Sequence, residues 1–522
     1  MINVNSKELP KGWCWVKLGD ICAQIETKNP NIDPESEFEY IDIASIDNTI
    51  KKIIFPKRYL GKNAPSRARQ LVRKNDIVFS TVRTYLMNIA LVPDSLDGQI
   101  ASTGFCVIRA KKELNQKFVF YYSLSHQFVE PLNELQRGTS YPAIRDSDVF
   151  GQPFPLCATA EQYRIVEKIE ELFSDLDKGI ESLKTTQQQL KIYRQAVLKW
   201  AFEGKLTAKW REDKKQQGEL KSADELLEQI KAEREKRDRT QLQEWHEAVK
   251  TWEANGKQGK KPGKPKKAKE LPSLTENEIA ELTKLPETWF WTKLGEMTLG
   301  VEYGTSAKSK KQGKVIVLRM GNIQRFIFDW SDLVYSDDDE EIEKYLLRKG
   351  DILFNRTNSP ELVGKSAIYQ GEKSAIFAGY LIRINQINEL ANSKYLNYFL
   401  NSTIAKNYGN KVKTDGVNQS NINGEKLISY PLPYCSLEEQ HQIVQEIEFR
   451  LSICDRLEAT ITENLTRAEA LRQSILKQAF EGKLVPQDPN DEPAEKLLER
   501  IKQEKLDSKN GKQLELEIFE TS

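Results

Sequence analysis

Basic side chains are concentrated in two stretches of the chain, and this pattern has a clear chemical meaning. No acidic residue occurs between residues 48 and 75 or between residues 303 and 328, although both stretches are rich in lysine and arginine. Such cations neutralise DNA phosphates. One stretch alone is typical of a solvated lysine-rich loop, so it is the recurrence that favours phosphate binding. The candidate phosphate contacts are Lys57, Arg58, Arg67, Arg69 and Arg73 in the first stretch, and Lys310, Lys311, Arg319 and Arg325 in the second.

Side chains suited to reading bases follow the ends of expected strands and occur again in later glycine-containing loops. Arginine pairs with guanine in the major groove, and asparagine or glutamine pairs with adenine. Each position taken alone is typical of an ordinary loop residue. The candidates are Thr81, Arg83, Tyr85, Arg137, Ser140 and Tyr141 in the first half of the chain, and Asn355, Arg356, Asn358, Lys413, Asn418 and Gln419 in the second.

Catalytic motifs are not found. The sequence Gly364-Lys365-Ser366 matches the end of a phosphate-binding loop, but the glycine required five residues earlier is Ser359. Pro93-Asp94 has no following Glu-x-Lys or Asp-x-Lys that would complete a nuclease site, and there is no Asn-Pro-Pro-aromatic motif of amino-methyltransferases. The three histidines are scattered, which makes a histidine metal cluster unexpected. We therefore expect no catalytic centre, metal site or cofactor in this chain.

Length and composition indicate several folded domains. A chain of 522 residues is too long for one hydrophobic core, and its 30% of charged residues exceeds the usual quarter, which favours long solvated helices. The formal net charge is only +1, so any DNA binding must depend on where the charges lie. Six cysteines without a Cys-x-x-Cys pair predict a reducing, cytoplasmic setting. The polar start and the lack of an apolar run of about 20 residues predict neither secretion nor a membrane partner.

The chain is an internal repeat of two unequal copies. The opening sequence LPKGWCWVKLG at residues 9–19 returns as LPETWFWTKLG at residues 285–295. The segments between the matching motifs differ far more than the motifs do, so a duplicated frame holds two diverged domains. The other matching pairs are residues 73–79 with 348–354, the helix starts 160–166 with 438–444, the Ala-Phe-Glu-Gly-Lys-Leu endings 201–206 with 479–484, and the short helices 223–230 with 494–501.

Each globular section has the pattern of short β-branched strands followed by one helix, a glycine-containing loop and a last apolar strand. The expected strands are 40–46, 77–82, 89–92 and 104–109 before a helix at 117–135, and 315–320, 352–355, 365–369 and 376–384 before a helix at 394–408.

Two helices of about 40 residues, or roughly 60 Å each, follow the globular sections and carry heptads. Seams of this kind bury themselves against a second helix. The expected seam positions are Ile169, Leu176, Leu183, Leu190 and Val197 with Leu172, Tyr193 and Trp200, and Ile447, Cys454, Ile461, Ala468 and Ile475 with Leu457 and Leu471.

A connector of different composition separates the two copies. Residues 256–267, GKQGKKPGKPKK, contain too little apolar material to fold alone and predict a flexible tether. Trp245 and Trp252 precede it, and a short helix docked on a neighbour explains them better than a binding role. The predicted domains are an N-terminal recognition domain at 1–157, a helical region at 158–240, a charged linker at 241–284, a C-terminal recognition domain at 285–435, a distal helical region at 436–508 and a tail at 509–522.

Over nearly its whole length the sequence resembles the specificity subunits (HsdS family) of type I restriction-modification systems. The resemblance rests on the two LPxxWxWxxLG openings, on the helix starts at Glu161-Gln162 and Glu439-Gln440, and on the two Ala-Phe-Glu-Gly-Lys-Leu endings. It implies an α+β fold in which two mixed α/β target recognition domains are separated by two long antiparallel helices forming a coiled coil. The lysine-rich stretch at residues 257–269 is not part of the shared motifs.

The resemblance also implies a function for each part. The two domains would each read one half of a split site on double-stranded DNA, and the helices would act as a ruler between them. Two methyltransferase subunits would dock on the helical frame, and motor-nuclease restriction subunits would join in the full complex. S-adenosylmethionine, ATP and magnesium would then belong to these partners. Two other functions remain open from the residues alone: a coiled-coil interaction scaffold without DNA reading, and a divergent stand-alone nuclease.

Overall fold

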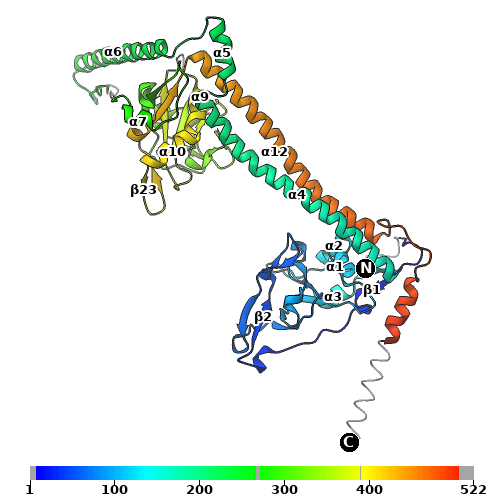
Figure 1. The fold of residues 1–522 in the computed structure, drawn as a ribbon. Helices are drawn as coiled ribbons and strands as arrows, with labels where there is room; N and C mark the ends of the chain where they lie inside the picture. Colours follow the sequence, from blue (N-terminus) through cyan, green and yellow to red (C-terminus); the bar gives the residue numbers. More distant parts are fainter. Residues whose placement is uncertain (1–7, 260, 266–270, 388–389, 505–522) are drawn as a thin grey trace. The chain divides into compact units, whose positions relative to one another are not determined.

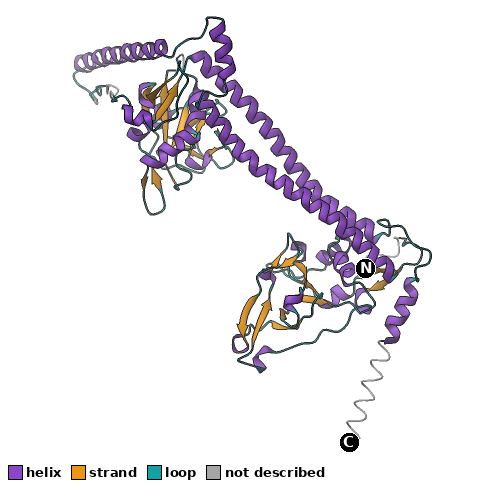
Figure 2. Ribbon diagram, viewed as in Figure 1, coloured by secondary structure: helices purple, strands orange, loops and turns teal. Residues whose placement is uncertain are grey.

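The computed structural model describes residues 8–259, 261–265, 271–387 and 390–504 (Figure 1). The chain forms two compact units, of which the first consists of residues 1–184 and 461–522 and the second of residues 185–460. Each unit combines short strands and short helices with one part of each long helix (Figure 2). The predicted fold class, two mixed α/β domains with two long helices, is therefore confirmed.

The globular part of the first unit contains a four-stranded sheet of order β5-β2-β9-β6, a three-stranded sheet of order β10-β7-β8 and the pairs β1-β11 and β3-β4. Strand β1 pairs with β11 antiparallel, so the opening motif lies beside the last strand of its own domain. The strands are β1 (Cys14–Lys17), β2 (Glu37–Ile41), β3 (Ile46–Asp47), β4 (Lys52–Ile53), β5 (Lys57–Leu60), β6 (Ala68–Leu71), β7 (Ile77–Ser80), β8 (Ile89–Leu91), β9 (Ile100–Ser102), β10 (Phe105–Ile108) and β11 (Pro153–Leu156).

The globular part of the second unit has a similar plan with additional strands. Its sheets have the orders β13-β22-β18-β20, β17-β14-β21 and β19-β24-β23, with the pairs β12-β25 and β15-β16. The strands are β12 (Phe290–Lys293), β13 (Thr298–Tyr303), β14 (Val315–Leu318), β15 (Ile323–Gln324), β16 (Ile327–Phe328), β17 (Val334–Ser336), β18 (Ile352–Asn355), β19 (Thr357–Asn358), β20 (Ser366–Ile368), β21 (Ala375–Phe377), β22 (Leu381–Gln386), β23 (Thr414–Asp415), β24 (Ser420–Asn421) and β25 (Pro431–Tyr434).

Each of the two helices predicted inside the domains is in fact two helices. Helix α1 (Gln116–Ser123) ends before Ser125, whose hydroxyl donates to the Tyr122 carbonyl, and α2 (His126–Glu134) follows. Helix α9 (Ser393–Leu400) is followed by α10 (Thr403–Val412), where the Ser402 hydroxyl accepts the Ala405 N–H. Ser402 thus satisfies a free N–H group at the start of α10 and marks a helix boundary, whereas the Ser125 side chain makes no such cap bond. The shorter helices are α3 (Asp146–Phe150), α5 (Ala208–Gln216), α7 (Glu276–Ala280), α8 (Asp339–Tyr345) and α11 (Gly424–Ile428).

The long helices α4 (Thr159–Phe202) and α12 (Leu437–Phe480) each have 44 residues. Most predicted seam positions are buried or partly buried, as expected for paired heptads. Two supporting positions are wrong: Leu457 is 46% exposed and Leu471 is 48% exposed. Both leucines therefore lie outside the buried seam of α12.

The two helices run antiparallel within each unit. In the first unit Asp177 forms an ion pair with Arg472, while Arg164, earlier in α4, pairs with Asp491. In the second unit Arg194 pairs with Asp455 at 2.7 Å. Residue numbers thus rise along α4 as they fall along α12 and its continuation.

A tryptophan of each opening motif bonds to the glutamate that begins each long helix. The Trp13 indole N–H donates to Glu161 Oε2 at 3.0 Å, and the Trp289 indole N–H donates to Glu439 Oε2 at 2.8 Å. Both glutamates are buried, and burial raises the pKa of Glu161. These bonds explain why the two motifs recur together: a tryptophan without its glutamate would leave a buried donor unpaired.

The two glutamates differ in their remaining partners. The second oxygen of Glu439 accepts hydrogen bonds from Thr207 Oγ1 at 2.7 Å and from the Arg211 guanidinium at 2.5 Å. The second oxygen of Glu161 is buried and has no partner among the described residues. The same motif therefore closes the second domain more firmly than the first.

The glutamine that follows each glutamate ties the long helix to a domain helix. Gln162 accepts the backbone N–H of Asn115, which caps α1, and donates to the Cys157 carbonyl. Gln440 accepts the backbone N–H of Asn392, which caps α9. The Glu-Gln pair is therefore a structural joint and not a binding site.

The end of each long helix packs on the domain of the other repeat. Phe480 is the last residue of α12, and the centre of its ring lies 5.1 Å from that of Phe118 and 4.9 Å from that of Tyr122 in the first domain. Phe202, which closes α4, lies 5.2 Å from Tyr395 of the second domain. The helical segments that follow bond to the same openings, since the Ala494 N–H donates to Gly12 and the Ala223 N–H to Thr288.

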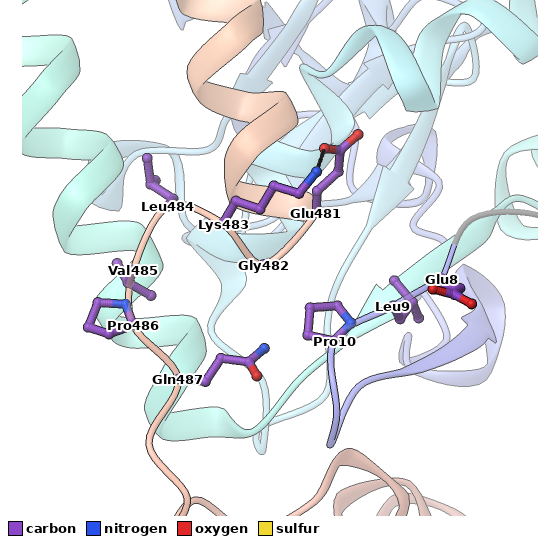
Figure 3. Close-up of a pocket in the computed structure, with 10 residues that line it drawn as sticks. All are labelled: Glu8, Leu9, Pro10, Glu481, Gly482, Lys483, Leu484, Val485, Pro486 and Gln487. Atoms are coloured by element: carbon purple, nitrogen blue, oxygen red, sulfur yellow. Dashed lines mark hydrogen bonds and ion pairs between the residues drawn. The ribbon is translucent and has the colours of Figure 1, made fainter.

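The glycine after each long helix is required by both conformation and space. Gly482 has φ +66°, and a Cβ on it would lie 2.3 Å from the Pro10 ring; Gly204 has φ +72° and the same relation to Pro286. A shallow groove follows this junction in the first unit, between residues 8–10 and 481–487 (Figure 3). The backbone at Gly482 and Gly204 lies so close to a proline ring that no side chain fits there, which explains the glycine of the Ala-Phe-Glu-Gly-Lys-Leu ending.

Replacing Gly482 with alanine is expected to destabilise the first unit by at least about 1–2 kcal/mol, the cost of a left-handed L-residue, with the clash against Pro10 in addition. Gly179, in the middle of α4 with no heavy atom near its would-be Cβ, is the matched control. Gly179→Ala is expected to stabilise by about 0.5–1 kcal/mol. Thermal unfolding of both variants measures this, and a shift of the same sign in the two would contradict the assignment.

The connector begins later than predicted. Helix α6 (Asp224–Ala254) continues through residues 241–254, which were expected to belong to the linker. The Trp245 and Trp252 indoles donate to the carbonyls of Pro262 and Gly259, and Lys264 and Lys261 lie over their rings. The described part of the tether thus folds back along α6, because the tryptophans supply the contact surface that its own composition lacks.

Candidate nucleic-acid interface

In the first domain the loop after β7 runs beside the glycine-containing loop at residues 137–143. The backbone N–H of Arg83 donates to the Pro142 carbonyl at 2.8 Å, and the Ile144 N–H donates to the Thr81 carbonyl at 2.9 Å. Arg137 and Ala143 bridge the base of the second loop. Two groups of candidates that are more than 50 residues apart in sequence are therefore adjacent.

The second domain brings the equivalent loops together in the same way. The Ile422 N–H donates to the Arg356 carbonyl at 2.9 Å, and β19 pairs with β24 through Thr357 and Asn421. Strands β23 and β24 form a hairpin whose tip carries Asn418 and Gln419, both exposed. In both domains, therefore, the loop after the core strand is bonded to the glycine-containing loop, but the residues on these loops differ between the domains.

Arg83 is held in place by its loop. Its backbone has φ +50°, an uncommon left-handed conformation that clusters at functional sites. Its guanidinium lies 4.9 Å from the centre of the Tyr141 ring and donates to the Ser140 carbonyl at 3.1 Å. Tyr141 itself is 72% exposed, and Tyr85 is exposed on the same loop pair. Arg83, Tyr85, Ser140 and Tyr141 thus lie on the same pair of adjacent loops.

Arg356 has the same surroundings in the second domain. Its guanidinium lies 4.9 Å from the centre of the Tyr303 ring, and it donates a long bond of 3.4 Å to the Gly379 carbonyl. The Tyr303 hydroxyl accepts the Gly424 N–H at 2.7 Å, which fixes the ring. Tyr303 was not among the predicted site residues; its only signal in the sequence was an aromatic side chain at the start of an acid-free stretch.

Three predicted base contacts need correction or qualification. Thr81 is 6% exposed and its hydroxyl donates to the Gly104 carbonyl, while Asn355 is fully buried. Neither side chain can reach a base from this position, because both lie on the inner side of the strand end. The side-chain oxygen of Asn358 already accepts a hydrogen bond from the Ser359 N–H at 2.8 Å.

The basic stretch of the first domain is not free of acids in space. Strand β5 pairs with β2, which brings Lys57 to 2.7 Å from Asp42 and Arg58 to 3.4 Å from Glu39. The hydrogen bond to Asp42 raises the pKa of Lys57. Among the remaining candidates, Arg73 pairs with Glu26, Arg137 lies 3.8 Å from Asp148, Arg69 donates to the Ala68 carbonyl, and Arg67 is exposed.

The basic stretch of the second domain is neutralised in the same manner. Lys310 pairs with Asp337 at 3.0 Å and Arg319 with Asp332 at 2.8 Å. The remaining candidates are Arg325, which pairs with Glu458, Lys413, which lies 3.6 Å from Asp415, and Lys311, which is exposed. Exposed ion pairs of this kind contribute little to stability, so a phosphate can replace the carboxylate.

One lysine of the first stretch is a weak cation. Lys51 is partly buried, and its ammonium group donates to the Met87 carbonyl at 2.8 Å. Burial lowers its pKa to about 8. Its contact with the end of the Arg83 loop makes it a support for that loop.

The described residues contain no group of three or more histidine, cysteine, aspartate or glutamate side chains arranged to hold a metal ion. Within the same part of the chain, every helix is too short or too polar to cross a bilayer.

Comparison with known proteins identifies related chains along the whole length. The family profile described as the type I restriction modification DNA specificity domain matches twice, at residues 10–191 and 286–467. The specificity subunit of the type I restriction enzyme EcoKI from Escherichia coli K12 is 26% identical, over 77% of this chain and 75% of its own length. The StySPI specificity subunit from Salmonella potsdam is 25% identical over 96% and 97%.

Solved structures agree with this relationship. A chain from a study of complex assembly and conformational transition in a type I R-M system has a TM-score of 0.65 and 26% identity, over 91% of this chain and 99% of that one. The HsdS subunit from Thermoanaerobacter tengcongensis has a TM-score of 0.54 and 26% identity, over 92% and 99%. With its two matched domains, its paired long helices and its two loop clusters, this chain belongs to the type I restriction modification DNA specificity family.

Proposed function

We propose that the chain selects the DNA sites on which a type I restriction-modification complex acts, and that each domain reads one half of a bipartite site. One observation carries this proposal. In both domains the loop after the core strand is bonded to the glycine-containing loop, while the side chains presented there differ. Such a design keeps the frame constant and varies the bases read. The long helices then set the distance between the half-sites.

The partners follow from the family and from the surface of the helices. We assign to the chain double-stranded DNA, two methyltransferase subunits and, in the full complex, motor-nuclease restriction subunits. Ile192, Phe449, Leu457 and Leu471 are exposed on the long helices and are candidate contacts for the methyltransferase subunits. Catalysis, S-adenosylmethionine, ATP and magnesium belong to the partners. All six cysteines are free thiols, which fits a cytoplasmic setting.

Methylation mapping tests the proposal directly. Plasmid DNA is modified by the methyltransferase subunits with and without this chain, and the methylated bases are located by long-read sequencing. We expect a split motif that appears only with the chain. Methylation that ignores the chain, with no band shift on DNA, would favour the coiled-coil scaffold, and DNA cleavage by the chain alone would favour a nuclease.

Salt dependence tests the phosphate contacts. Lys311 is exposed, and we expect Lys311→Ala to lower the slope of log K against log salt by about 0.9, the value for one phosphate. Lys178, an exposed lysine of α4 outside the loop clusters, is the matched control because Lys178→Ala makes the same change in charge. Fluorescence anisotropy over a salt series gives both slopes. Equal slopes for the two variants would remove Lys311 from the interface.

A further inference from the structure

We infer that each domain reads one guanine of its half-site through a single arginine that is stacked on a tyrosine: Arg83 on Tyr141 in the first domain and Arg356 on Tyr303 in the second. This inference rests on the proposed function, since it names residues and a base within the same two loop clusters. Arginine is chosen because its planar fork of N–H donors matches the O6 and N7 acceptors of guanine in the major groove.

The two arginines differ in their surroundings from the predicted cations that are paired with acids. Lys57, Arg58 and Arg73 of the first domain lie against carboxylates, and Lys310 and Arg319 of the second do so too. Arg83 and Arg356 form no ion pair with a carboxylate of the described residues and lie instead on aromatic rings, both at 4.9 Å. A guanidinium that is positioned without being neutralised keeps its charge and its donors for a ligand.

The positions of the two arginines show that the arrangement is not a relic of the shared frame. Arg83 lies three residues after β7, whereas Arg356 directly follows β18. Their tyrosines come from different places as well, Tyr141 from the glycine-containing loop and Tyr303 from the end of β13. Two diverged loops therefore reach the same geometry from different residues, which is expected where a common ligand group selects it.

Each guanidinium is oriented before DNA arrives. Arg83 donates one N–H to the Ser140 carbonyl, and Arg356 donates one to the Gly379 carbonyl. The Nε of Arg356 is buried without a partner among the described residues, which leaves the two terminal nitrogens for an end-on contact. Stacking on a ring and bonding to a fixed carbonyl restrict the side-chain rotamers, so less freedom is lost when a base binds.

Charge-conserving variants test this inference in the assembled methyltransferase complex. Arg83→Lys and Arg356→Lys keep the positive charge but lose the planar fork. Each variant methylates a plasmid library randomised across the motif, and sequencing counts the methylated sites. We expect Arg83→Lys to reduce the preference for one guanine by about 5- to 150-fold in the first half-site alone. Arg356→Lys should do the same in the second half-site alone.

The unaltered half-site is the internal control for folding and assembly in each variant. Tyr141 is a positioning residue and gives a second readout: Tyr141→Leu removes the ring and should weaken the same guanine preference, whereas Tyr141→Phe keeps the ring and should preserve it. A purely structural tyrosine would change the stability of the domain and the yield of complex in Tyr141→Leu without changing which base is preferred.

Several outcomes overturn the inference while the proposed function stands. A wild-type split motif without guanine in the affected half-site is one. An unchanged base preference in Arg83→Lys is another, and a uniform loss of methylation over all sequences would make Arg83 a phosphate contact. If the wild-type chain directs no split motif at all, the proposed function fails and the inference fails with it.

Discussion

Replacing Glu439 with alanine is expected to lower the stability of the second unit by about 3–5 kcal/mol, the usual cost of removing one partner of a buried ion pair. Glu439 accepts hydrogen bonds from the Trp289 indole, from Thr207 and from the Arg211 guanidinium, which is itself mostly buried. Without the Glu439 carboxylate, the charge of Arg211 stays largely buried and has lost its partner. Amide hydrogen exchange of β12 and β25 measures the effect locally.

Glu161→Ala is the matched control for this prediction. Glu161 occupies the same place in the first copy and accepts a hydrogen bond from the Trp13 indole, but its other oxygen has no partner among the described residues. Its removal should cost about 1–3 kcal/mol, the value for an unsatisfied buried donor. Equal losses for the two variants would mean that Arg211 and Thr207 add nothing to the closure.

Exchange of a whole domain is expected to have the largest effect on specificity. When residues 1–155 are replaced by the corresponding segment of a relative, we expect the first half-site to be replaced entirely and the second to remain. The physical reason is that the loop clusters of the two units share no residue, while the frame contacts of Trp13 and Asn115 are restored by any segment that carries them. Methylation mapping of the hybrid complex gives the result.

The reciprocal exchange of residues 285–435 completes the test. It should replace the second half-site and leave the first unchanged. A hybrid in which both half-sites change would contradict independent domains. Loss of all methylation has a separate explanation in failed folding, which the yield and the thermal unfolding of the purified hybrid identify.

Sequence was sufficient for features that depend on period and repetition. The long helices were expected because heptads and repeated endings can be recognised directly in the sequence. The seam residues Ile169, Val197, Ile447 and Cys454 are buried, as predicted. Both loops were selected as candidate sites because their residues changed where the frame did not, but the sequence did not reveal that the two loops are adjacent. Boundaries within the domain helices were missed although Ser402 was a visible cap signal.

The sequence was insufficient wherever the pairing between strands determines which side chains are neighbours. The acid-free stretch around Lys57 and Arg58 suggested an uncompensated basic face, but β5 lies beside β2, where Glu39 is opposite Arg58 and Asp42, just after the end of β2, pairs with Lys57. A count of charges along the sequence does not show which residues of neighbouring strands lie opposite each other. Leu457 and Leu471 were assigned to the seam for a similar reason, since a heptad position predicts burial only where a partner side chain is opposite.

The closure of the first domain by Phe480 has a consequence for protein synthesis. Phe118 and Tyr122 await an aromatic partner that the ribosome adds more than 350 residues later. At about 5–20 residues per second, this domain leaves the exit tunnel and stays unsealed for some tens of seconds. The second domain has no such delay, because Phe202 is translated before it. The part of the chain made first is thus the part completed last, and it is the nascent segment with the longest exposure to chaperones and proteases.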